Sequence, residues 1–154
     1  MQIQIPVTQE FLAHRLNNQK KYKQGRRTPV KFLMDLDCEL PEFYLYNHIP
    51  NIKKSPTWQY DIIHPTHHRC DLKQISTNNY ITIKNHLTTS FDHYIFWKWI
   101  TPHNKPLELN ESYTIEITKV AEKSYIDKLL KPSIKGEGYY IGEKEVQKYT
   151  VFTL

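Results

Sequence analysis

The chain has 154 residues, of which 39% are hydrophobic and 24% charged, and this composition is typical of a globular protein and excludes wholesale disorder. Its 21 basic and 16 acidic residues give a formal net charge of +5. The length fits one domain, and no apolar stretch approaches the roughly 20 residues needed to cross a bilayer, so we expect no membrane partner.

Three further classes of protein are excluded by the N-terminus, the cysteines and the glycines. The opening MQIQIP has neither the basic nor the apolar region of a secretory signal, so we expect a cytoplasmic protein, in the host cytoplasm if a phage encodes it. Cys38 and Cys70 are too few for a disulfide framework. Only 4 glycines are present, and neither GxxxxGK[ST] nor GxGxxG occurs, so no phosphate-binding glycine loop is expected.

The first third of the chain predicts helices around one strand. Residues 8–18 form a helical pattern that Thr8 can cap. Residues 30–40 alternate between apolar and acidic side chains, which predicts a half-buried strand or an imperfect helix that Pro41 interrupts. Pro41 is also suited to open a short helix at 42–48.

Positive charge is concentrated in the same part of the chain. Between residues 11 and 34 there are seven basic residues and no acidic one, and the other 14 basic residues are slightly outnumbered by the 16 acidic ones. The seven are Arg15, Lys20, Lys21, Lys23, Arg26, Arg27 and Lys31. Such a cluster is the usual electrostatic footprint of a site for a phosphate backbone, and a solvated face that binds nothing is the alternative.

The rest of the chain predicts mainly strands. Alternating or continuously apolar segments lie at 57–64, 69–75, 80–83, 93–100 and 113–118. The segment 93–100 is almost entirely apolar, which indicates a central strand covered on both faces. Helices are expected at 120–130 and 143–149, and Gly136 and Gly138 turn the chain into a short apolar segment at 139–141.

Together these elements predict an α/β (α+β) fold in which a mixed central sheet is flanked by helices. We expect residues 1–154 to form one domain, with a basic helical N-terminal segment at 1–34 and a core at 35–154.

One group of residues has the pattern of a candidate catalytic site. Asp71 and Lys73 lie two apart on a predicted strand, so they share a face while Leu72 points the other way. Asp61 precedes the turn on the neighbouring strand, and the loop length decides where it points. An odd loop, such as 65–67, sets Asp61 beside Asp71 or Lys73, and an even loop sends it to the opposite face.

Two carboxylates and a lysine on one face suit divalent-metal hydrolysis of a phosphodiester. Carboxylate oxygens hold Mg²⁺, the Leu72 carbonyl lies within reach of the same ion, and Lys73 orients or activates the nucleophile. Two close carboxylates without metal repel each other, so we expect one of them to have a raised pKa that Lys73 partly offsets.

The chain here resembles the PD-(D/E)XK nuclease superfamily, the restriction-endonuclease-like proteins. Asp61 matches the first acid and residues 71–73 match the D-x-K element. Residues 90–97 look like the strand that often follows in these proteins after a short crossover, and residues 135–141 resemble the end of several small phage and restriction-type members. Tyr60 departs from the pattern, because a proline usually precedes the first acid.

The resemblance implies a restriction-endonuclease-like fold and a small phage-type endonuclease that acts on DNA with Mg²⁺, or Mn²⁺, as cofactor. Asp61 and Asp71 would be metal ligands, Lys73 would orient the attacking water, and Glu39 or Glu42 would support the metal. A homodimer is implied as well, since a single site cuts one strand. The basic residues Arg15, Lys20, Lys21, Lys23, Arg26 and Arg27 would bind the nucleic acid.

Four alternatives remain open at this stage. Asp61 and Lys73 are compatible with a surface ion pair worth under about 1 kcal/mol. A crowded turn suggests zinc ligation by His64, His67, His68 and Cys70. Asp35-Leu36-Asp37 resembles the D-x-D pairs that hold metals in phosphatases. A non-catalytic nucleic-acid-binding or virion-associated protein would use only the basic segment at 15–31.

Aromatic residues supply one further expectation. The chain has 11 Tyr, 6 Phe and 3 Trp, a set able to stack on unpaired bases. Those between 94 and 99 are expected in the core, whereas Trp58 and Tyr60 precede Asp61 and are better placed to line a site.

Overall fold

The computed structural model describes residues 1–154 except 85, 135–137, 148–149 and 152–154. Its helices are α1 (Gln9–Lys21), α2 (Pro29–Asp37), α3 (Leu40–His48), α4 (Lys123–Leu129) and α5 (Glu143–Val146). Its strands are β1 (Gln2–Pro6), β2 (Lys53–Lys54), β3 (Ile62–His64), β4 (His68–Gln74), β5 (Tyr80–Ile83), β6 (His93–Trp99), β7 (Ser112–Glu122), β8 (Lys131–Pro132), β9 (Tyr139–Gly142) and β10 (Thr150–Val151).

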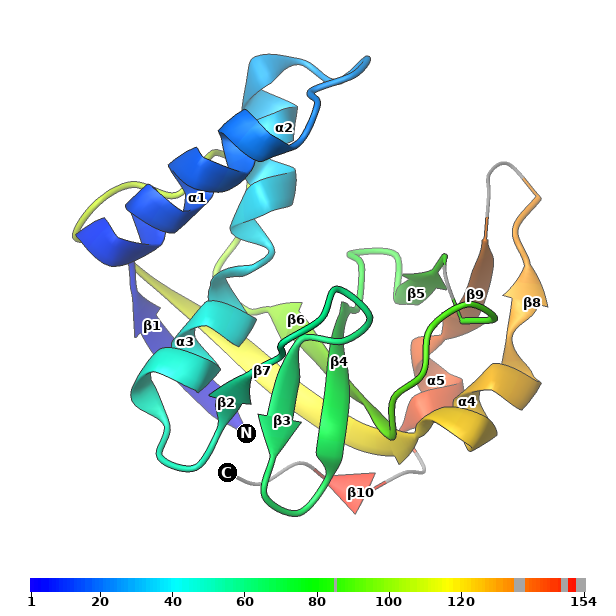
Figure 1. The fold of residues 1–154 in the computed structure, drawn as a ribbon. Coiled ribbons are helices and arrows are strands. Elements are labelled where there is room, and N and C mark those ends of the chain that lie inside the picture. The colour runs from blue at the N-terminus through cyan, green and yellow to red at the C-terminus, as the bar shows by residue number, and fades with distance from the viewer. Residues whose placement is uncertain (85, 135–137, 148–149, 152–154) are drawn as a thin grey trace.

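A mixed sheet organises the molecule (Figure 1). Its strands follow the order β1-β7-β6-β4-β3-β2, and β10 pairs with β7. Strands β4 and β6 run parallel, and the other pairs in this sheet are antiparallel. A smaller sheet, β5-β9-β8, lies beside α4 and α5. The expected mixed α+β fold with a central sheet flanked by helices is confirmed.

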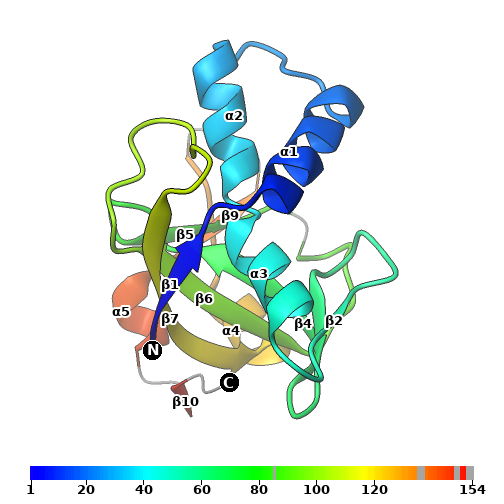
Figure 2. The ribbon, with the colours of Figure 1, turned by 90° about the vertical axis from the view of Figure 1, so that its left-hand side faces the viewer.

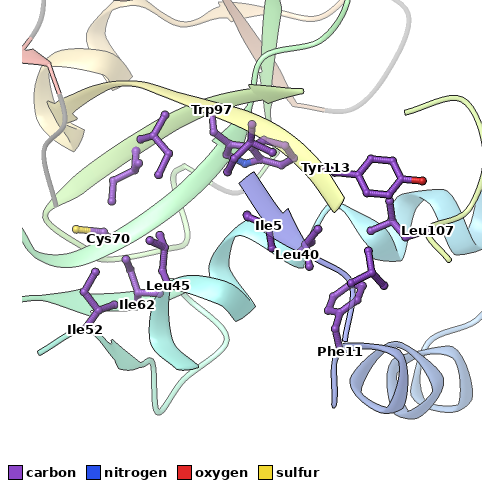
Figure 3. Close-up of a cluster of buried hydrophobic side chains, with 14 of the residues drawn as sticks. Ile5, Phe11, Leu40, Leu45, Ile52, Ile62, Cys70, Trp97, Leu107 and Tyr113 are labelled. Carbon is purple, nitrogen blue, oxygen red and sulfur yellow. The ribbon is translucent and has the colours of Figure 1, made fainter. Parts of the chain in front are cut away.

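Buried side chains form clusters on both faces of β6, as expected for a central strand. Ile95 and Trp97 belong to a cluster that includes residues of α1 and α3 (Figure 3). Tyr94 and Phe96 belong to a second cluster that includes Ile126 of α4 and residues of the smaller sheet. Because the strand alternates between these clusters, it is apolar at nearly every position.

The helical arm, which we define as residues 9–37, holds α1 and α2 side by side at one end of the sheet (Figure 2). Thr8 caps α1 by accepting a hydrogen bond from the Phe11 amide, as predicted, and α1 extends three residues further than expected. Residues 30–40 form no strand. Thr28 caps α2 and Pro29 occupies its first turn, and these signals outweigh the apolar alternation.

Other boundaries also differ from expectation. The strand expected at 57–64 shrinks to β3, because residues 55–61 form a loop. Strand β7 continues to Glu122 and takes the start of the helix expected at 120–130, since Val120 and Ala121 are buried in the two clusters. Part of the helix expected at 143–149 and part of the tail segment 135–141 fall outside the described residues.

The N-terminal segment is less separate from the core than the sequence suggests. Residues 2–6 form β1, which pairs with β7 in the main sheet, and α2 runs across the boundary expected between 34 and 35. Among the described residues, no helix has the length and apolar character needed to cross a membrane.

Candidate active site on the β3–β4 hairpin

The β3–β4 hairpin brings Asp61 and Asp71 to the same face. His64 pairs with His68, so the loop holds the three residues 65–67, and Ile62 pairs with Cys70. Beyond this pair the Asp61 amide donates to the Cys70 carbonyl at 2.9 Å, and Asp61 Oδ2 accepts from the Leu72 amide at 2.7 Å. The odd loop and the shared face that the sequence left open are therefore confirmed.

Lys73 completes the D-x-K element. Its Nζ lies 2.9 Å from Asp71 Oδ2, and the Lys73 and Asp71 side chains are 30% and 12% exposed. Strand β4 positions both residues by pairing them with Tyr94 and Phe96 of β6, while its ladder with β3 ends at Cys70. The alternative of an isolated surface ion pair does not describe this largely buried arrangement.

Helix α3 supplies Glu42. Leu40 and Leu45 are buried and anchor the helix against the sheet, which places Glu42 close to Asp61. Glu39 has different partners: its Oε2 is 2.8 Å from His14 Nε2 and 2.5 Å from Asn18 Nδ2. Of the two glutamates that the sequence offered, Glu42 is the one that joins the two aspartates.

The pKa values of Asp71 and Glu42 are shifted because these groups are buried and lie close to another carboxylate. Burial, and then the Asp61 carboxylate, raise the pKa of Asp71 to about 7, against the lowering effect of Lys73. Burial and Asp61 also raise the pKa of Glu42 well above its usual range. Burial lowers the pKa of Lys73, but the three carboxylates outweigh it and raise this pKa. The raised pKa that we expected for one acid of the pair is confirmed.

The donor set is one of hard oxygens. Among the described residues, no group of three or more His, Cys, Asp or Glu side chains is arranged to hold a metal ion. Mg²⁺ needs no such protein cage, because it usually binds through one or two carboxylates and keeps waters and substrate phosphate oxygens. Asp61 and Asp71 fit that requirement, because a cation would stabilise the half-buried Asp61 carboxylate and the buried Asp71 carboxylate, which repel each other.

A cleft of about 680 Å³ opens onto this site. Glu42 and Asp61 form part of its lining, together with the end of α1 and the loop 55–61. A smaller hollow of about 70 Å³ on the other side of the loop is lined by Asp71 and Lys73. Trp58 lines both spaces and Tyr60 lines the cleft, in agreement with the expectation that these aromatics border a site.

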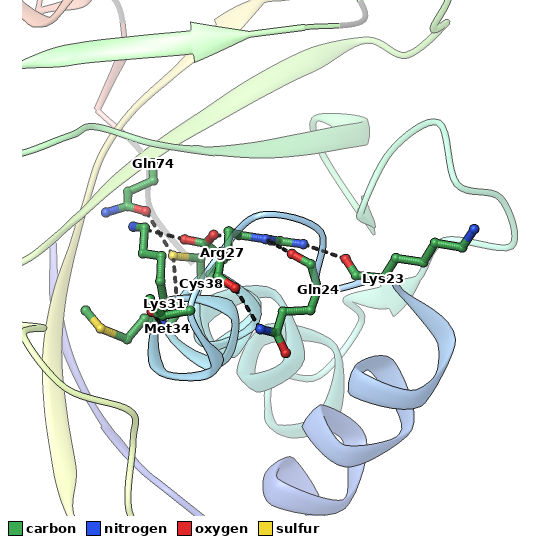
Figure 4. Close-up of polar contacts among 9 residues, drawn as sticks. Lys23, Gln24, Arg27, Lys31, Met34, Cys38 and Gln74 are labelled. Atoms are coloured by element: carbon green, nitrogen blue, oxygen red, sulfur yellow. Dashed lines mark hydrogen bonds and ion pairs between the residues drawn. The ribbon is translucent and has the colours of Figure 1, made fainter.

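The basic residues of the arm divide into two groups. Arg15 is 15% exposed and donates to Asp37 Oδ1 at 2.7 Å and to the Leu107 carbonyl at 3.0 Å. Arg27 donates to the carbonyls of Lys23 and Gln24 and pairs with Asp35, which fixes the loop between α1 and α2 (Figure 4). The exposed group consists of Lys20, Lys21, Lys23, Arg26 and Lys31. Arg15 and Arg27 therefore hold the arm together.

The histidine-rich turn has a structural explanation. His64 Nδ1 accepts from the amides of Thr66 and His67, and the rings of His64 and His67 stack at 4.7 Å. Burial lowers the pKa of His64 to about 4 and raises the pKa of Cys70 to about 12. Within the part of the chain that the structure describes, no group of three or more His, Cys, Asp or Glu side chains is arranged to hold a metal ion, so the zinc alternative finds no support.

Several cleft residues escaped the sequence prediction. His14 and Asn18 lie one turn apart on α1, Tyr46 lies one turn after Glu42 on α3, and Lys54 is in β2. Four-residue spacing within the two predicted helices was the available signal for three of them. Lys54 had no signal beyond its charge.

Comparisons with known proteins give no identification. No protein-family model, curated protein or solved structure matches this chain.

Proposed function

We propose that this chain is a divalent-metal-dependent nuclease that hydrolyses phosphodiester bonds of DNA, in the manner of the PD-(D/E)XK superfamily that its sequence resembles. The observation that carries the proposal is the convergence of Asp61, Asp71 and Lys73 on the hairpin, with Glu42 of α3 beside Asp61. Structural ion pairs usually balance charge, whereas this group places three acids beside one base. Perturbed pKa values at a cleft are a common property of catalytic groups.

Each residue has a role that follows from its position. Asp61 and Asp71 would hold Mg²⁺ or Mn²⁺, with Glu42 supporting them from the cleft side. The bound metal would supply an activated water and would offset charge on the phosphate. Lys73, tied to Asp71 at 2.9 Å, would place its ammonium group against the attacking water or a phosphate oxygen. The exposed bases of the arm would hold the DNA backbone.

A plasmid assay tests the proposal. Purified protein is incubated with supercoiled DNA and Mg²⁺, Mn²⁺ or EDTA, and relaxed and linear products are separated on a gel. We expect cleavage with either metal, none with EDTA, and loss of cleavage in Lys73→Ala. Lys128→Ala, an exposed lysine of α4, is the matched control and should cut normally. A metal-independent rate, or an active Lys73→Ala protein, would refute the assignment.

The product pattern also tests the expected homodimer. One site cuts one strand, so a monomer should release mostly nicked circles. Two associated copies should release linear DNA in a single encounter. A ratio of linear to nicked product that rises with protein concentration would support the dimer, and a constant ratio would contradict it.

A non-catalytic DNA-binding protein is the second candidate, because four basic residues around the end of α1 (Lys20, Lys21, Lys23 and Arg26) are exposed. That protein would retard DNA on a gel in both Mg²⁺ and EDTA and would leave the plasmid intact under all conditions.

A further inference from the structure

Trp58 is the most exposed of the three tryptophans, and it stands at the mouth of the candidate site. Its exposed fraction is 74%, whereas Trp97 is 2% exposed. Hydrogen bonds inside the loop hold its backbone, since Ser55 Oγ donates to the Thr57 carbonyl and Thr57 Oγ1 accepts from the Gln59 amide. Gln59 Oε1 also accepts from the Ser90 amide at 3.2 Å, which ties the loop across the hollow. The structure therefore presents a large ring to solvent from an ordered loop.

The end of α1 brings a second exposed ring and a lysine to the same cleft. Tyr22, 48% exposed, ends α1 beside Lys21, whose Nζ lies 5.5 Å from the centre of the Tyr22 ring. On the side of Trp58, the lysine is Lys54, exposed in the edge strand β2. All four residues line the cleft, and Glu42 and Asp61 lie with them. Two exposed rings, two lysines and two acids around one cleft suit a chain of bases and phosphates.

The accessibility of the base faces decides which form of DNA can use Trp58. The cleft has a volume of about 680 Å³, in the range of small-molecule sites, so it offers room for a short piece of one strand. In a duplex, the faces of the bases are stacked on each other and are closed to Trp58. Stacking on an aromatic side chain needs an unpaired base.

We infer that the cleft binds an unpaired DNA strand and that Trp58 stacks on one of its bases, placing the adjoining phosphate beside Asp61, which lines the cleft next to the hollow that holds Asp71 and Lys73. The inference rests on the proposed function for the reaction at the base of the cleft, although strand binding itself needs no cleavage. The preferred substrate is then single-stranded DNA or the single-stranded part of a branched or frayed duplex, in place of a regular duplex.

Binding is measured without cleavage, so the two proposals fail separately. Fluorescence anisotropy in EDTA compares a labelled mixed-sequence oligonucleotide, its blunt duplex, and the duplex with a single-stranded extension. We expect the single strand and the extended duplex to bind more tightly than the blunt duplex. Trp58→Ala should weaken binding of the single strand by roughly tenfold, the value of one base stack, and should leave the blunt duplex nearly unchanged. Trp58→Phe should restore most of the affinity.

Tyr125→Ala removes an exposed aromatic residue of α4 and is the control that should bind normally. Intrinsic fluorescence gives an independent readout, because the single strand should quench emission in the wild-type protein and not in Trp58→Phe. Matching circular dichroism spectra and thermal midpoints show that the variants are folded. Tighter binding of the blunt duplex, or unchanged single-strand affinity in Trp58→Ala, would overturn the inference. An equal loss for both forms of DNA would overturn it as well.

Discussion

Two tripeptides of this chain, Asp35-Leu36-Asp37 and Asp71-Leu72-Lys73, look alike in sequence and act differently in the structure. The first lies in α2, where residues two apart point about 200° apart around the helix axis. The second lies in β4, where residues two apart share a face. Secondary structure alone therefore separates the first pair of charges and joins the second.

The surroundings enlarge this difference. Asp37 is fully buried and is matched by Arg15, with a hydrogen bond from the Leu107 amide, and Asp35 pairs with Arg27 and Lys31. Asp71 instead meets another acid, Asp61, and shares one lysine with it. The pair in α2 is neutralised and binds the arm to the body, whereas the hairpin keeps an excess of negative charge. Only the second arrangement has unbalanced negative charge that a bound cation would neutralise.

The largest expected effect is on catalysis. Asp71→Asn removes a carboxylate from the proposed metal site, and we expect Mg²⁺-dependent cleavage to fall by at least about 10²-fold. Asp35→Asn makes the same change in the other tripeptide and should cut at the wild-type rate. Initial rates of plasmid nicking at matched protein and metal concentrations give the comparison. Equal rates in the two variants would remove the distinction between the tripeptides.

The second prediction concerns stability, for which the tripeptide in α2 should matter most. Asp37→Ala leaves Arg15 without its buried partner, and we expect the free energy of unfolding to fall by about 3 kcal/mol, with a drop of roughly 6–12 °C in melting temperature. Asp35→Ala breaks half-exposed pairs and should change stability by less than about 1 kcal/mol. Chemical unfolding measures both. Similar losses in the two variants would contradict the structural role of Asp37.

A double variant sharpens this result. Arg15→Leu alone should also destabilise, because it leaves Asp37 buried without its cation. Combined with Asp37→Ala, it should cost less than the sum of the single changes, since neither charge is then left unpaired. Strict additivity would mean that the two side chains do not depend on each other.

Much of the hairpin was predictable and one part was not. Alternating side chains and Pro65 indicated two strands joined by a turn, but the parity of the loop stayed open. In the structure His68 adopts a positive φ of 59° at the end of this loop, a conformation that Gly or Asn would have signalled more strongly than His. The choice of Glu42 over Glu39 depends on how α3 packs on the sheet, which is a long-range contact. The apolar alternation at residues 30–40 also left a strand open as an alternative, whereas the Thr28 cap and Pro29 favour the helix α2 that forms.

The pH dependence of stability provides a third test. The pKa of Asp71 is raised from 3.8 to about 7, so between these values the folded protein holds a proton that the unfolded chain has released. Asp71 therefore makes the folded state less stable as pH rises from about 4 to about 7, and adds no further change above that. In EDTA, the difference in unfolding free energy between wild type and Asp71→Asn should vary across this window. A constant difference would refute the raised pKa.

Metal should reverse the trend, because Mg²⁺ and protons compete for the same carboxylates. We expect added Mg²⁺ to raise the melting temperature of the wild-type protein more at pH 8 than at pH 6, and EDTA to abolish the gain. Asp71→Asn should lose most of this response and Asp35→Asn should keep it. An equal gain in the two variants would place the bound ion elsewhere.

The smallest effect concerns three exposed bases of the helical arm, Lys20, Lys23 and Arg26. Changing Lys20, Lys23 and Arg26 to Gln should weaken DNA binding and lower the slope of log affinity against log salt. For each phosphate that the arm no longer neutralises, the slope should fall by about 0.9 on a duplex and about 0.7 on a single strand.

The control changes Lys128 and Lys144, exposed on α4 and α5, and should keep the wild-type slope. Because these bases lie away from the carboxylates, the cleavage rate at saturating DNA should hold in both variants. An unchanged slope in this variant would mean that Lys20, Lys23 and Arg26 do not contact the DNA backbone.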